Sequence, residues 1–133
     1  MSSSARHSLN ITLWVLQVLL AVAFLAHGWI FLFPSPEMAE LMKPIPYPFR
    51  MFLGIAEVLA AVGLTLPGMT RIQPWWVPSA AAGLMIVMIA ATIFHITRGE
   101  IGASVTTTIL LLMATFVAYM RWKVMPILPR TAA

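Results

Sequence analysis

The sequence predicts an all-α integral membrane protein, in which four apolar helices form a bundle with a short interfacial helix between spans 1 and 2. Of its 133 residues, 61% are hydrophobic and only 9% are charged, whereas about a quarter of an ordinary soluble domain is charged. A chain this short has too much surface for its volume to hide such an apolar excess from water. Four apolar runs are long enough to cross a bilayer core of roughly 30 Å, which takes about 20 helical residues.

The spans are expected within one transmembrane domain covering residues 1–133, at about 9–33, 49–66, 75–97 and 101–120. A turn bounded by Pro67 and Pro74 joins the second and third spans, and residues 98–100 join the third and fourth. Such short connections make helices that are neighbours along the chain antiparallel neighbours in the bundle.

The segment between the first two spans contains five prolines in residues 34–48, which exclude a continuous helix across it. Within it, Ser35 is a suitable helix cap, Pro36 suits the first helical position, and Glu37 lies in the first turn, where the helix dipole favours an anion. These signals predict a short helix that lies at the membrane interface.

Cysteine is absent and the formal net charge is +4. The lack of thiols excludes a disulfide framework, a zinc–thiolate site, an iron–sulfur cluster and a cysteine nucleophile. The basic residues stand singly or in pairs at the edges of the apolar runs, a pattern typical of membrane flanks and not of a nucleic-acid surface. The expected partners are therefore the lipid bilayer and other membrane protein subunits, with no nucleic acid.

The distribution of positive charge predicts the orientation. The side that holds both termini carries Arg6, Arg71, Arg121, Lys123 and Arg130, and the opposite side carries Lys43, Arg50 and Arg98. Because positive residues are enriched on the cytoplasmic side, both termini are expected in the cytoplasm, in a bacterial cytoplasmic membrane.

Small and hydroxyl side chains indicate how the spans contact one another. Runs of glycine and alanine in the second and third spans predict close helix contacts. One face of the fourth span carries Ser104, Thr108, Thr115 and Tyr119. This face predicts hydrogen bonds to neighbouring helices.

Glu57 lies near the middle of the second span, where a carboxylate costs at least about 2.5 kcal/mol and must face inward. His27 lies in the second half of the first span and His95 near the end of the third, so antiparallel alternation puts both toward the side opposite the termini. Arg98 and Glu100 follow on that side. These five residues are the candidate polar pocket, and no catalytic residue is assigned.

Three interpretations of this pocket stay open. It is a structural hydrogen-bond network, a binding site for a quinone or another lipid-soluble ligand, or a site for acid–base or metal chemistry. No metal site is predicted, because two histidines and a carboxylate from three spans have no diagnostic spacing. No resident cofactor is predicted, and a bound quinone or lipid is the class left open. The residues do not decide whether the protein is an enzyme.

The sequence resembles the DoxX-like family of small four-span membrane proteins. The residues that carry the resemblance are Gly28, Gly54 and Glu57, the run Gly63–Pro67, the run His95–Glu100, and Arg121–Trp122. Phe31 departs from the pattern, because many relatives have a lysine there. The resemblance extends from about residue 24 to residue 122.

What this resemblance implies is a membrane subunit of a redox assembly, since better understood relatives include subunits of thiosulfate-to-quinone electron transfer. The leading hypothesis is thus an accessory or anchoring subunit of a larger membrane complex, linked to redox or quinone chemistry. The alternative is a small intramembrane enzyme or binder that acts on a hydrophobic ligand through Glu57 and His27 or His95.

Overall fold

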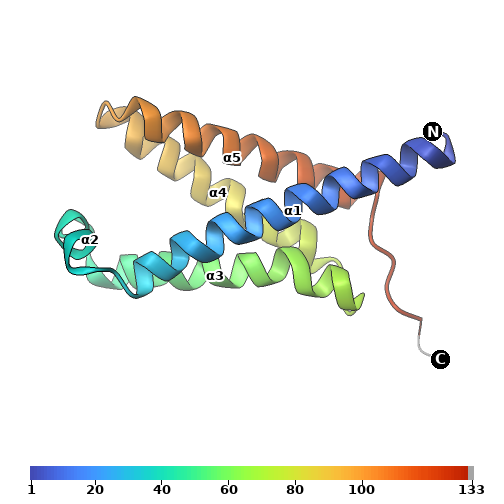
Figure 1. Ribbon diagram of the computed structural model, residues 1–133, viewed down its shortest axis with the longest axis horizontal. Helices are drawn as coiled ribbons and strands as arrows, with labels where there is room; N and C mark the ends of the chain where they lie inside the picture. Colours follow the sequence, from blue (N-terminus) through green and yellow to red (C-terminus); the bar gives the residue numbers. More distant parts are fainter. Residues whose placement is uncertain (132–133) are drawn as a thin grey trace.

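Four long apolar helices form the bundle, as the computed structural model shows for residues 1–131, the part of the chain that it describes. The helices are α1 (Ser3–Leu32), α3 (Tyr47–Thr70), α4 (Trp76–Thr97) and α5 (Ile101–Tyr119). A π-helical turn, η1 (Met120–Val124), extends α5. The start of α1 and the segment that follows η1 lie at the same end of the bundle, the termini end (Figure 1). The predicted fold class is confirmed.

The short helix between the first two spans is also confirmed. It is α2 (Pro36–Leu41), and it lies at the end of the bundle away from the termini (Figure 1). Ser35 caps it as expected, because the Ser35 hydroxyl oxygen accepts a hydrogen bond from the Met38 backbone N–H at 3.3 Å. Pro36 occupies the first helical turn, where its missing N–H has no intrahelical partner to lose.

Pro67 does not end the second span. The sequence predicts a turn from Pro67 to Pro74, but α3 continues through Pro67 to Thr70, and Arg71 ends it with a φ of 59°. The physical reason is that an unwound turn at membrane depth leaves several backbone groups without partners, whereas a proline removes a single donor. α1 similarly begins at Ser3, earlier than expected, because the Ser2 side chain caps it.

The bundle consists of two helix pairs, α1 with α3 and α4 with α5, joined mainly by contacts between α3 and α4 (Figure 1). The buried apolar residues of α4 and α5 lie in residues 77–88 and 114–118, near the end that holds the termini. Toward the opposite end, buried residues of α1 and α3 continue to Phe31 and Gly54. The core common to all four helices therefore occupies the termini half of the bundle.

The predicted interhelical hydrogen bonds from the polar face of α5 are wrong. The hydroxyls of Ser104, Thr108 and Thr115 donate to carbonyls of α5 itself, at 2.7–2.8 Å. A serine or threonine in a helix reaches the carbonyl three or four residues earlier more easily than a neighbouring helix. The hydroxyl bond between helices is instead made by Thr92 of α4, which donates to Thr107 of α5 at 2.8 Å.

Candidate functional site

The close approach of α1 and α3 rests on two glycines. A Cβ atom on Gly28 would lie 2.9 Å from the Gly54 carbonyl oxygen, and one on Gly54 would lie 2.8 Å from the Leu32 side chain. Only a hydrogen fits at either position, so the two backbones meet directly, as small residues allow in membrane helices. A Cβ on Gly28 would also lie 3.1 Å from the Cβ of Glu57. This glycine therefore makes room for the carboxyl side chain as well.

His27 and Glu57 form a hydrogen-bonded pair at this contact. The distance from His27 Nδ1 to Glu57 Oε2 is 2.6 Å. The Glu57 side chain is only 2% exposed, whereas the His27 side chain is 53% exposed and its ring packs against Phe31. A proton lies between the two atoms, on either Nδ1 or Oε2, because a contact this short requires a donor. Burial thus hides the carboxyl and leaves the imidazole on the outer surface of the bundle.

His95, Arg98 and Glu100 form a second cluster in the turn between α4 and α5. His95 Nδ1 lies 2.5 Å from Glu100 Oε2, and Arg98 Nε donates to Glu100 Oε1 at 2.8 Å. Gly99 adopts a φ of 70°, a left-handed conformation that turns the chain back so that Glu100 reaches both partners. The hydrogen bond from Arg98, and secondly that from His95, hold the pKa of the Glu100 carboxyl below its usual value.

The five predicted pocket residues therefore form two clusters. Within residues 1–131, no hydrogen bond or ion pair joins His27 and Glu57 to the cluster around Glu100. The two clusters belong to different helix pairs, and the core common to both pairs lies at the other end of the bundle. In the described part of the chain, no three His, Cys, Asp or Glu side chains gather as a metal site.

The environment of Arg121 is not predicted by the sequence. Its place at the edge of an apolar run indicates a charge that flanks the fourth span, but in the structure Arg121 is only 3% exposed. Its Nε donates to Gln17 Oε1 at 2.6 Å, and its Nη1 donates to Asn10 Oδ1 at 2.8 Å. Gln17 in turn donates to the Leu64 carbonyl at 2.8 Å. One feature of the sequence points to this network, namely the polar Gln17 inside an apolar span, which needs a hydrogen-bond partner. The sequence does not indicate that Arg121 is that partner.

Comparison with known proteins identifies the family. The model of the DoxX-like family matches residues 15–117, which include α3, α4, most of α1 and most of α5. Comparisons with curated proteins and with solved structures gave no match. Glu57, His27 and the cluster around Glu100 all lie inside the matched region, whereas Arg121 lies just beyond it. The match covers well over half of the chain, so this integral membrane protein belongs to the DoxX-like family.

Proposed function

We propose that the protein is an accessory subunit of a larger redox complex in the membrane, and that its His27–Glu57 pair binds a lipid-soluble quinone. The observation that carries the proposal is the 2.6 Å contact between a buried carboxyl and a half-exposed imidazole at membrane depth. Ionisable residues inside spans are functional candidates. Better understood members of the DoxX-like family include subunits of quinone-linked assemblies, which supports the redox assignment.

The pair has the chemistry that a quinone needs. With the proton on Glu57, the carboxyl donates to His27 Nδ1, and the free Nε2–H is a donor for a quinone carbonyl oxygen. When a redox partner subunit delivers two electrons to the quinone, Nε2 gives its proton to that oxygen, Nδ1 takes the proton of Glu57, and Glu57 is left as a carboxylate. The other quinone oxygen takes the second proton from water at the membrane interface, and water also reprotonates Glu57. Nε2 then accepts a hydrogen bond from the new hydroxyl beside it, so the pair supplies one of the two protons and matches both redox forms.

Quinone binding is tested on the purified full chain in lipid nanodiscs, with a decyl benzoquinone as the probe. His27→Gln is expected to weaken binding by about tenfold or more, as loss of a hydrogen bond to a charged or proton-sharing group does. His95→Gln makes the same chemical change in the other cluster and is expected to leave affinity unchanged. If wild type, His27→Gln and His95→Gln bind the benzoquinone with equal affinity, the quinone assignment is wrong.

The subunit assignment is tested by extracting the protein from its own membrane in mild detergent and recording native mass spectra. Stoichiometric partner subunits are expected in the same particle. A lone chain with full activity would contradict the accessory role while leaving the quinone test unaffected.

The shared proton also favours a second candidate, an intramembrane enzyme that isomerises a hydrophobic substrate by proton transfer. Glu57→Gln tests the enzyme candidate, because glutamine keeps a hydrogen bond to His27 but cannot exchange a proton. An enzyme loses turnover in this variant while it still binds its ligand. Unchanged turnover in a folded Glu57→Gln protein would eliminate the enzyme.

A further inference from the structure

The guanidinium of Arg121 carries a charge that, within residues 1–131, is offset only by a cation–π contact with the Trp14 ring, whose centroid lies 5.5 Å from Cζ. It is buried, and within residues 1–131 no carboxylate lies within ion-pair distance of it. Its partners are the neutral oxygens of Gln17, Asn10 and the Met125 carbonyl, and its Nη2 has no hydrogen-bond partner. Buried cations are normally paired with an anion, and an orphaned buried donor calls for an explanation.

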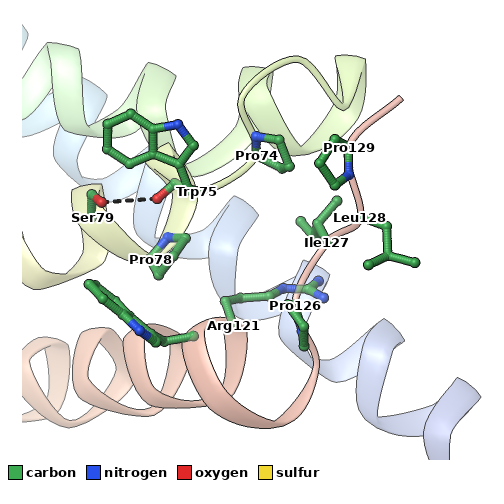
Figure 2. A pocket seen from close by; sticks show the side chains of 10 residues that line it. Pro74, Trp75, Pro78, Ser79, Arg121, Pro126, Ile127, Leu128 and Pro129 are labelled. Atoms are coloured by element: carbon green, nitrogen blue, oxygen red, sulfur yellow. Dashed lines mark hydrogen bonds between the residues drawn. The ribbon is translucent and has the colours of Figure 1, made fainter. Parts of the chain in front are cut away.

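A cavity of about 360 Å³ lies beside this guanidinium, between the start of α4, η1 and the chain that follows. Figure 2 shows Arg121 on its wall, with the guanidinium end next to Pro126. The rest of the wall is largely apolar and includes Trp75, Pro78, Trp122 and Ile127. The volume lies within the range of roughly 300–1000 Å³ that small-molecule sites occupy. An apolar wall with one cation fits a ligand that has an anionic head and an apolar chain.

The cavity lies at the membrane depth where lipid head groups are found. Trp75 and Trp122 are exposed at this end of the bundle, and such rings favour the interface between head groups and acyl chains. Arg71, Lys123 and Arg130 add positive charge at this end. All four glutamates of the chain lie elsewhere: two in α2, one in the His27–Glu57 pair and one in the turn before α5. The field of this end therefore attracts anions.

The chain after η1 lines the cavity beside Arg121 and is bonded to Arg71, which ends α3. Arg71 Nε donates to the Leu128 carbonyl at 3.0 Å, and the Arg130 N–H donates to the Arg71 carbonyl at 2.9 Å. Arg121 itself holds this segment only through a longer 3.2 Å bond from Nη1 to Met125. Because Nη2 is buried, a ligand head in the cavity reaches it only when the groups around it shift.

We infer that this cavity binds an amphiphile with an oxyanion head, whose phosphate or carboxylate pairs with Arg121 and whose chain lies along the tryptophan and proline wall. A guanidinium binds both kinds of oxyanion through parallel N–H donors. The site lies at the opposite end of the bundle from His27, so it does not depend on the quinone proposal.

The test uses native mass spectrometry of the full chain in mild detergent with equal amounts of phosphatidylglycerol and phosphatidylcholine. Parallel samples contain oleate or inorganic phosphate, which distinguishes a phospholipid from a fatty acid or a free ion. Wild type is expected to retain one phosphatidylglycerol or one oleate. Arg121→Gln is expected to retain about tenfold less. Lys123→Gln, which removes the same charge from an exposed residue nearby, is expected to lower retention far less, because salt screens an exposed charge.

A second variant keeps the inference testable if Arg121→Gln fails to fold. Ser79 lines the cavity but shares no hydrogen bond with Arg121, and its hydroxyl donates to the Trp75 carbonyl. Ser79→Phe fills the cavity and is expected to lose the adduct at an unchanged melting temperature. Undiminished retention in a folded Ser79→Phe protein overturns the inference. So does equal retention of phosphatidylcholine, or retention of inorganic phosphate with neither amphiphile.

Discussion

At the scale of single residues, Glu57 shows how a carboxyl is accommodated between apolar helices. Its side chain is almost fully buried, and its hydrogen-bond partner is His27 on the neighbouring helix. Lipid offers no substitute for a lost partner, because the hydrocarbon has no donors or acceptors. The stability of the α1–α3 contact therefore depends on the imidazole as well as on the glycines.

Removing that imidazole is expected to destabilise the fold. His27→Ala leaves the Glu57 carboxyl buried without a partner, which costs about 1–3 kcal/mol. The free energy of unfolding in mixed detergent micelles measures this loss. The double variant with Glu57→Leu is expected to recover part of it, since no polar group is then left unpaired. A single variant as stable as wild type would show that the pair does not stabilise the fold.

Glu100 gives the turn between α4 and α5 a dependence on acid. Because its pKa in the folded protein is held below the usual 4.5, its bonds to Arg98 and His95 stabilise the turn above that value. This contribution is lost as the pH falls through the lowered pKa. Hydrogen exchange of the Gly99 and Glu100 amides, corrected for the intrinsic rate, is expected to lose protection in that acid range. Glu100→Gln should abolish the acid step, and a step that persists in it would contradict the assignment.

At the scale of elements, the α1–α3 contact includes a direct backbone approach at Gly28 and Gly54. Gly28 of α1 and Gly54 of α3 face each other, and the backbone of each helix occupies the space that a side chain on the opposite glycine would need. α4 and α5 both contribute residues to the buried core, among them Leu84 and Val117, and share the Thr92–Thr107 hydrogen bond. Within the described residues, no such glycine pair is seen between α4 and α5, because a Cβ on Gly83 or on Gly102 meets nothing within 4 Å.

Gly28→Ala is expected to separate α1 from α3. The added Cβ would lie 2.9 Å from a backbone carbonyl, a clash that only a helix shift relieves, at about 1–3 kcal/mol. Gly83→Ala is the matched control, because a Cβ there meets nothing within 4 Å, and alanine favours a helix by about 1 kcal/mol. Thermal unfolding should therefore move in opposite directions for the two variants. A loss of stability in both would point to a general intolerance of substitution.

At the scale of the whole molecule, polar groups are divided between the two ends of the bundle. The end with α2 holds the acidic side chains of the turns, and the end with both termini holds the buried Arg121 network and most of the exposed cations. This division predicts cytoplasmic termini, because positive charge is retained on that side.

The lack of cysteine makes the orientation directly measurable. Single cysteines at exposed positions, Ser4→Cys near the amino terminus and Glu37→Cys in α2, are treated with a membrane-impermeant maleimide on intact cells. Labelling is expected at position 37 alone, and at both positions after the membrane is permeabilised. Labelling of position 4 on intact cells would reverse the orientation.

Apolar run length and proline position, both local properties, are enough to predict the four spans, the cap at Ser35 and α2, because a helix in lipid must satisfy its own backbone. The same reasoning finds Glu57, since a carboxyl inside a span is conspicuous in any sequence. It wrongly ends α3 at Pro67, because a proline suggests a turn but does not show how much it would cost to unwind the helix at membrane depth.

Only the tertiary structure decided which polar groups meet. His27 and His95 are both expected on the side opposite the termini, yet Glu57 bonds to His27, while His95 turns to Glu100. Arg121 stands at the edge of an apolar run, yet it is buried against Gln17, far away along the chain. Such pairings depend on how helices cross and how far their pairs diverge. Sequence periodicity tells which face of a helix a residue occupies, and only packing brings two faces together.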